Sequence, residues 1–265
     1  MNDEFYIGWE AKAAPGIGST VRRAVVVLLV LAVALAVSLA VAQRMIGVSV
    51  FEWGKVKEFS GILRATPYPH LLVPRPGKEE FHTLQRVESG PSAFSTYYLV
   101  APWKFGLKPE AIAPFDGKSV TLKGTLIYRG NQTMIETKPE WIAFSTNDER
   151  RARSDVPYQS LGKQTLTGEI VDSKCFLGVM NPGQLTPHRA CAIRCISGGC
   201  PPVLLVRQAD GPASYLLLVS ADGKPVNQQV LEMVAEPLEI TGEVVRQGDL
   251  LILRADPSTY RRAGK

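Results

Sequence analysis

The four cysteines of this 265-residue chain lie close together in the sequence, and they are the side chains most suited to a reaction or to metal binding. They fall within a segment of 26 residues that also contains a histidine, and the five side chains are Cys175, His188, Cys191, Cys195 and Cys200. Cysteines that only fill a hydrophobic core would be scattered, so this clustering indicates that they act together. Three kinds of chemistry suit the set: disulfide crosslinking, metal binding and thiol redox reactions.

Disulfide bonds are the first interpretation. An even number of cysteines is typical of exported proteins, and residues 172–202 form a long segment that is poor in large apolar residues and would gain stability from a crosslink. If residues 188–195 form a helical turn, Cys191 and Cys195 share a face, and a bond between them would be strained. We therefore expect Cys175 to pair with Cys191 or Cys195, although four cysteines allow three pairings.

Metal binding is the second interpretation. His188, Cys191 and Cys195 are separated by two and three residues, and Cys175 or Cys200 would complete a set of four ligands. Tetrahedral cysteine and histidine ligation suits zinc, and soft thiolates also suit Cu(I). Zinc or copper is therefore the cofactor to expect if the segment is a site; otherwise the sequence predicts none.

A redox-active dithiol is the third interpretation. Arg189 and Arg194 lie near the cysteines, and a positive field favours the thiolate. The sequence has no Cys-x-x-Cys pair, Gly-x-Ser-x-Gly, Walker loop, dinucleotide glycine motif or His-Glu-x-x-His, so we predict no catalytic residue. Asp172 and Glu169 precede the first cysteine, but carboxylates at strand ends are usually solvated.

An internal repeat organises the rest of the chain. Residues 119–139 align without a gap with residues 237–257, and the alignment places Gly124 on Gly242. Each copy reads as an alternating strand, a Gly-polar turn and a second strand. Weaker matches earlier in each half include Gly61 on Gly168. We interpret this as a duplication.

The repeat defines two domains, at residues 51–144 and 164–257. The polar, turn-rich residues 145–163 suit a linker between them. The second copy is longer, and the extra length falls in the cysteine-rich insert at residues 172–202.

The order of the predicted strands resembles that of bacterial OB-fold domains. An opening strand with an inner glycine, a middle strand ending at a turn, and a closing hairpin recur in both halves. The resemblance implies a mainly β protein with two tandem OB-like Greek-key barrels, in which glycines let bent strands close. It carries no specific activity.

An apolar segment precedes the two domains. Residues 24–42 carry no charge and, as a helix, span about the 30 Å of a bilayer core. Arg22 and Arg23 come directly before, so we expect residues 1–23 in the cytoplasm and the bulk of the chain on the periplasmic side of the plasma (inner) membrane. A cleaved signal peptide is the alternative, because residues 40–42 have the small-x-small pattern of a cleavage site.

The function classes follow from these features. The net charge is +5, but the basic residues are scattered and form no stripe interleaved with aromatics, so we expect no nucleic-acid partner. The first hypothesis is a non-catalytic, membrane-anchored accessory subunit that binds protein partners in a cell-envelope assembly such as a respiratory or redox complex. The alternative is a metal- or thiol-handling carrier that uses the cysteine-histidine segment.

Overall fold

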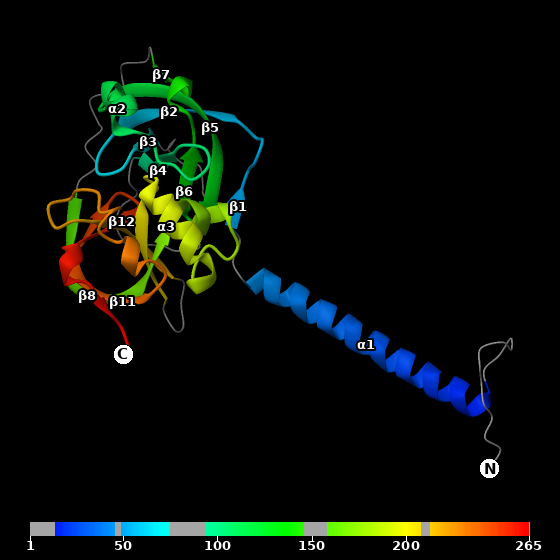
Figure 1. Ribbon diagram of the computed structural model, residues 1–265. Helices are drawn as coiled ribbons and strands as arrows, with labels where there is room; N and C mark the ends of the chain where they lie inside the picture. The colour runs from blue at the N-terminus through cyan, green and yellow to red at the C-terminus, as the bar shows by residue number, and fades with distance from the viewer. Residues whose placement is uncertain (1–13, 46–48, 75–93, 146–157, 208–212, 265) are drawn as a thin grey trace. The chain divides into compact units, whose positions relative to one another are not determined.

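The computed structural model describes residues 14–45, 49–74, 94–145, 158–207 and 213–264 (Figure 1). The chain divides into two compact units, which are residues 1–48 and residues 49–265. The described residues of the first unit contain one helix, and those of the second contain two β-barrels. Among the described residues the fold is therefore mainly β with an N-terminal apolar helix, as the sequence predicts.

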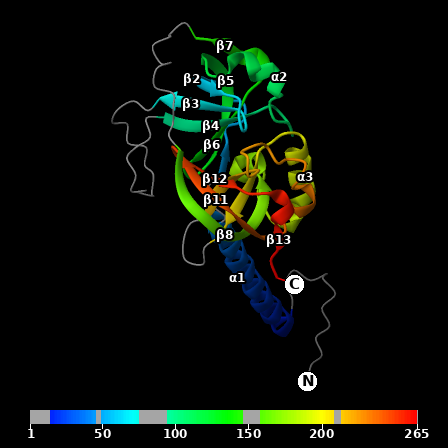
Figure 2. The same ribbon diagram turned by 90° about the vertical axis from the view of Figure 1, so that its left-hand side faces the viewer.

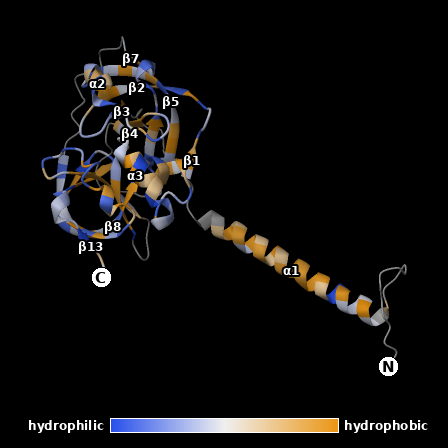
Figure 3. Ribbon diagram, in the orientation of Figure 1, coloured by the Kyte–Doolittle hydropathy of each residue, from blue (hydrophilic) through white to orange (hydrophobic). Residues whose placement is uncertain are grey.

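The helix α1 (Pro15–Met45) contains the predicted apolar segment. Its stretch Gly16–Ala42 has a mean hydropathy of 3.1 in its most apolar window and is long and apolar enough to cross a membrane. Figure 3 shows apolar residues along most of its length. A signal sequence near an N-terminus has the same properties, so the anchor, its orientation and the cytoplasmic N-terminus stay predictions. Residues 1–13 lie outside the described part of the chain.

The first barrel is built from five strands of a seven-stranded sheet. Its order is β2-β3-β4-β6-β5, and β5 pairs back with β2 to close it, while β1 and β7 pair with β5 outside the ring. The strands are β1 (Ser49–Phe51), β2 (Lys57–Arg64), β3 (His70–Pro74), β4 (Phe94–Val100), β5 (Ser119–Arg129), β6 (Gln132–Glu136) and β7 (Ile142–Phe144). Short helical turns follow β4 and β6: α2 (Pro109–Ile112), η1 (Ala113–Phe115) and η2 (Pro139–Trp141).

The second barrel repeats this order. Its ring runs β8-β9-β10-β12-β11, β11 pairs back with β8, and β13 is added at β11. The strands are β8 (Tyr158–Asp172), β9 (Pro202–Val206), β10 (Ser214–Val219), β11 (Pro237–Gln247), β12 (Leu250–Arg254) and β13 (Arg261–Arg262), with the turns η6 (Leu231–Met233) and η7 (Pro257–Thr259). Figure 2 shows the strands of the two sheets as separate groups. Both rings have the Greek-key order of an OB-like barrel.

One pair of neighbouring strands in each ring is parallel. The pairs β4–β6 and β10–β12 are parallel, and all other neighbours within the rings are antiparallel. A ring of five strands cannot alternate in direction all the way round, so one parallel pair has to close it.

The repeat is visible in the strand register. Gly61 lies opposite Val120 as Gly168 lies opposite Leu238, and Val120 and Leu238 are repeat equivalents. A Cβ on Gly124 would lie 2.3 Å from Ile135 Cγ2, and one on Gly242 would lie 2.4 Å from the Arg254 carbonyl oxygen. Gly124 therefore lets β6 approach the bent strand β5, and Gly242 lets β12 approach β11 in the same way.

The region between the barrels differs from the predicted linker. Strand β8 begins at Tyr158, so residues 158–163 belong to the second barrel and not to a linker. These residues form a strand because β11 is long enough to pair with them, through its residues Glu243 to Gln247. Residues 146–157 lie outside the described part of the chain. The predicted insert 172–202 corresponds to the connection between β8 and β9.

The two barrels share a hydrophobic core. One cluster of buried side chains contains Tyr98, Val100 and Met134 from the first barrel together with Val171 and Leu217 from the second. The insert contributes the buried Phe176 and Leu177 to this cluster, while Ala192 and Ile196 belong to a second cluster inside the second barrel. The insert therefore has no separate core, and its few apolar residues are buried against the barrels.

A buried lysine also joins the two barrels. Lys174 follows β8 and is 1% exposed. Its ammonium group lies 2.5 Å from the Glu136 carboxylate and donates to the carbonyl oxygens of Ala101 (2.8 Å) and Trp103 (2.7 Å). A buried charge is tolerated only when such partners replace its hydration. Lys174 thus holds the loop of residues 101–106 against the insert.

The glycine approaches lead to a prediction about stability. Gly124→Ala and Gly242→Ala should each lower the free energy of unfolding by about 1–3 kcal/mol, because a methyl group overpacks the hairpin contact. Chemical denaturation of the full chain in detergent micelles measures this. The control is Lys123→Ala, at an exposed position of β5. If either glycine variant is no less stable than this control, the shared role of the two glycines is wrong.

The buried ammonium group leads to a second prediction. Lys174→Met should lower the free energy of unfolding by about 3–5 kcal/mol, since it leaves the Glu136 carboxylate without its partner. The double variant Lys174→Met with Glu136→Gln should be more stable than Lys174→Met alone. Lys163→Met is the matched control, at an exposed position of β8. If Lys163→Met and Lys174→Met lower the free energy of unfolding equally, Lys174 does not hold the two barrels together.

Candidate cysteine-histidine site

The insert between β8 and β9 folds into three short helical elements. A single π-helical turn, η4 (Cys175–Val179), begins at the first cysteine; the turn η5 (Thr186–His188) leads into the helix α3 (Arg189–Ser197). The predicted helical turn is thus present and carries Cys191 and Cys195 one turn apart. Gly198 ends α3, and its carbonyl oxygen accepts from the amide of Gly106 in the first barrel.

The sulfur atom of Cys175 lies in contact with two others. Cys175 Sγ is 3.8 Å from Cys191 Sγ and 3.8 Å from Cys195 Sγ, and all four cysteines are free thiols. These separations are well above the roughly 2.05 Å of a disulfide bond. They match the edge of about 3.8 Å that a tetrahedron of sulfurs has at a zinc–sulfur distance of about 2.3 Å. The structure brings the expected partners of Cys175 together, and the disulfide itself stays a prediction.

A buried histidine-aspartate pair lies beside the sulfurs. His188 is 3% exposed and Asp172 is fully buried, and His188 Nε2 lies 2.9 Å from Asp172 Oδ2. The other carboxylate oxygen, Oδ1, accepts from the amide of Cys175 at 2.7 Å. Burial raises the pKa of Asp172, while the hydrogen bond from His188 opposes the rise. The expectation that this carboxylate is solvated was wrong.

The predicted ligands fall into two overlapping groups. Ligand atoms of Cys175, His188 and Cys191 all lie within 4.8 Å of one another, and so do those of Asp172, Cys175 and Cys195. Cys175 therefore belongs to both groups. Cys195 joins the second group and not the first, and Cys200 belongs to neither, although its thiol interacts with Cys195.

The thiols differ in their electrostatic surroundings. Hydrogen bonds from Cys175 and then Cys200 lower the pKa of Cys195, so negative charge is favoured on that sulfur. The same hydrogen bonds, together with burial, raise the pKa of Cys175 and of Cys200, which keep their protons as donors.

A lysine from the first barrel completes the site. Lys104 Nζ lies 2.7 Å from Cys191 Sγ, and this contact raises the pKa of the Lys104 ammonium group. Lys104 belongs to the loop that Lys174 holds in place. Sequence analysis missed both lysines, because neither carries a motif and each reaches the cysteines only through the packing of one barrel on the other.

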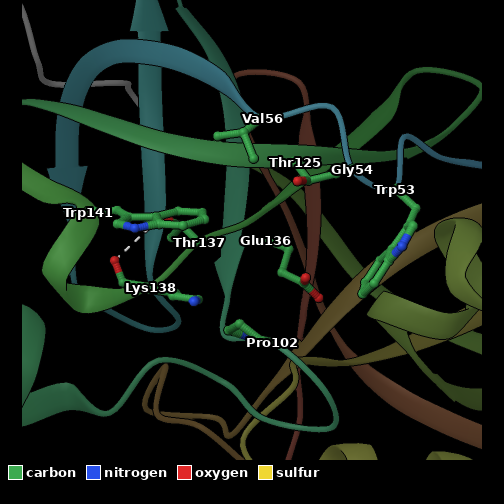
Figure 4. Close-up of a pocket in the computed structure, with 9 residues that line it drawn as sticks. All are labelled: Trp53, Gly54, Val56, Pro102, Thr125, Glu136, Thr137, Lys138 and Trp141. Carbon is green, nitrogen blue, oxygen red and sulfur yellow. Dashed lines mark hydrogen bonds between the residues drawn. The ribbon is translucent and has the colours of Figure 1, made fainter.

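An aromatic pocket of about 240 Å³ opens in the first barrel (Figure 4). Indole side chains of Trp53 and Trp141 line it together with Glu136, and Lys138 Nζ lies 4.9 Å from the centroid of the Trp141 ring. Trp53 is 74% exposed, and Trp103, on the adjacent loop, is 81% exposed.

Comparisons with known proteins do not place the chain in a family. No protein-family model matches it, and no curated protein matches its sequence. Among solved structures, a deletion mutant of the single-stranded DNA binding protein from Thermus aquaticus matches with 12% identity and a TM-score of 0.20. That match covers 83% of this chain and 89% of the other. At such a TM-score the match supports no argument about function, and the order of the strands is the basis for describing the barrels as OB-like.

Proposed function

We propose that this protein binds a thiophilic metal ion, zinc or Cu(I), in the insert of its second barrel. The observation that carries the proposal is the convergence of Cys175, His188 and Cys191, whose ligand atoms lie within 4.8 Å of one another. Two sulfurs and an imidazole nitrogen are ligands that both ions accept.

The buried carboxylate supports histidine ligation in particular. A histidine that binds a metal usually uses its second ring nitrogen on a carboxylate, which fixes the orientation of the ring. His188 Nε2 lies 2.9 Å from the fully buried Asp172, an arrangement in which Nδ1 is the nitrogen for the metal. Asp172 would then be the group that orients the ligand.

Three protein ligands leave a coordination position open. Closed structural zinc sites use four protein ligands, whereas three leave room for water, substrate or a partner's side chain. Cys191 is also half-buried, unlike the other three cysteines. These features support a carrier that exchanges its ion. With α1 as a membrane anchor, the carrier would work at the cell envelope, outside the cytoplasm.

The accessory-subunit hypothesis is the second candidate. The exposed indoles of Trp53 and Trp103 favour it, because large exposed aromatic side chains are typical of protein-protein interfaces. It requires no metal, so metal analysis separates the two hypotheses.

Metal loading gives the direct test. The full chain, purified in detergent micelles under reducing conditions and loaded with zinc or Cu(I), should retain about one ion. Cys175→Ser, His188→Ala and Cys191→Ser should each abolish retention, and Asp172→Asn should weaken affinity by about 10–100-fold. Competition between equimolar zinc and Cu(I) identifies the preferred ion.

Two matched controls keep this test specific. Cys200→Ser removes a buried thiol outside both ligand groups, and His70→Ala removes a buried histidine of the first barrel. Both variants should retain the ion. Full retention by His188→Ala, or no retention of either ion by the unmodified chain, would overturn the proposal.

A further inference from the structure

The position of Cys175 gives the site a second chemistry. Its sulfur lies at the same distance, 3.8 Å, from two other sulfurs, those of Cys191 and Cys195. Of the four cysteines only Cys191 is partly exposed, and the other three are buried. A reagent from solvent therefore meets the sulfur of Cys191 first, with that of Cys175 directly behind it.

We propose that the site carries out thiol-disulfide exchange with an external disulfide, with Cys191 as the attacking thiol and Cys175 as the resolving thiol. The proposal rests on the proposed function in one respect: because both cysteines belong to the metal group, oxidation would release the bound ion. The substrate class is a small-molecule or protein disulfide, which an oxidising compartment supplies.

The reaction balances without a further reactant. The Cys191 thiolate attacks one sulfur of the substrate disulfide, a mixed disulfide forms, and the other substrate sulfur leaves as a thiolate that takes up a proton. Cys175 Sγ then attacks Cys191 Sγ, the mixed disulfide breaks, and the second substrate sulfur leaves with the proton that the Cys175 thiol gives up. Two protein thiols have been oxidised, and one substrate disulfide has been reduced to two thiols.

The surroundings suit each step. The Lys104 ammonium group lies 2.7 Å from Cys191 Sγ, so a cation stands beside the attacking sulfur. Formation of the internal bond requires the two sulfurs to approach from 3.8 Å to about 2.05 Å. Cys175 begins the π-turn η4 and Cys191 lies in α3, so the bond joins two separate elements. A Cys191–Cys195 bond would instead bridge one helical turn and would be strained.

Trapping with oxidised glutathione tests the order of the two thiols. Metal-free full chain, reduced and then exposed to oxidised glutathione, should form an internal Cys175–Cys191 disulfide that peptide mapping detects. Cys175→Ser should accumulate a stable mixed disulfide on Cys191, and Cys191→Ser should form neither product. Lys104→Met should slow the first step by about tenfold, the effect of losing one charge 2.7 Å from the sulfur in water.

Cys195→Ser is the matched control, because Cys195 lies as far from Cys175 as Cys191 does but is buried. This variant should still form the Cys175–Cys191 disulfide. If it fails to do so, or if Cys175→Ser accumulates no adduct on Cys191, the proposal is overturned.

Metal release is measured separately, so that the two proposals fail independently. Oxidised glutathione added to metal-loaded protein should release the ion in the unmodified chain. If the chain exchanges with oxidised glutathione but never retains metal, only the proposed function is wrong. If the chain retains metal but Cys191 does not exchange with oxidised glutathione, only this inference is wrong.

Discussion

The ammonium group of Lys174 is a buried polar contact that ties the first barrel to the cysteine site. It is buried where its hydration is lost, and it is satisfied by one carboxylate and two carbonyl oxygens, all from the first barrel. Breaking such a set would leave charge uncompensated in the interior, so the second barrel cannot separate from the first without exposing it. Lys174 directly precedes Cys175, and the loop that it holds contains Lys104. A single buried cation therefore fixes both the start of the insert and the charge beside Cys191.

Shared use of Cys175 explains why the disulfide and metal hypotheses were hard to separate. Both chemistries need this sulfur near that of Cys191, and the observed 3.8 Å suits a tetrahedron of ligands as well as two thiols poised to bond. The two states exclude each other, because a thiol in a disulfide is no longer available as a thiolate ligand. If both proposals hold, the disulfide belongs to the oxidised state and the metal centre to the reduced state of one site, in which the Asp172–His188 pair would orient the metal ligand.

The sequence predicted the parts of the structure that depend on local pattern. Alternation and turn glycines predicted the hairpins on either side of Gly130 and Gly248, and the repeat predicted two barrels of equal strand order. The spacing of Cys191 and Cys195 predicted their shared helix. Burial of Asp172 and Lys174 could not be predicted, since each has its partners in other elements. The start of β8 was missed because its mostly exposed polar residues, which pair with β11 alone, look like a linker.

The two barrels differ most in the connection that carries the candidate site. In the first barrel β2 and β3 are joined by residues 65–69, whereas the equivalent connection in the second barrel holds the whole insert. This connection is one of the loops with which OB-folds bind their ligands. An insert of that length has too few apolar residues to form a core alone, so it needs a surface to pack on. The first barrel supplies that surface through its contact with Phe176 and Leu177, and it supplies Lys104 as well. The second barrel thus carries the cysteines and the histidine, and the first barrel supplies the surface on which the insert packs. Neither barrel by itself contains all residues of the candidate site.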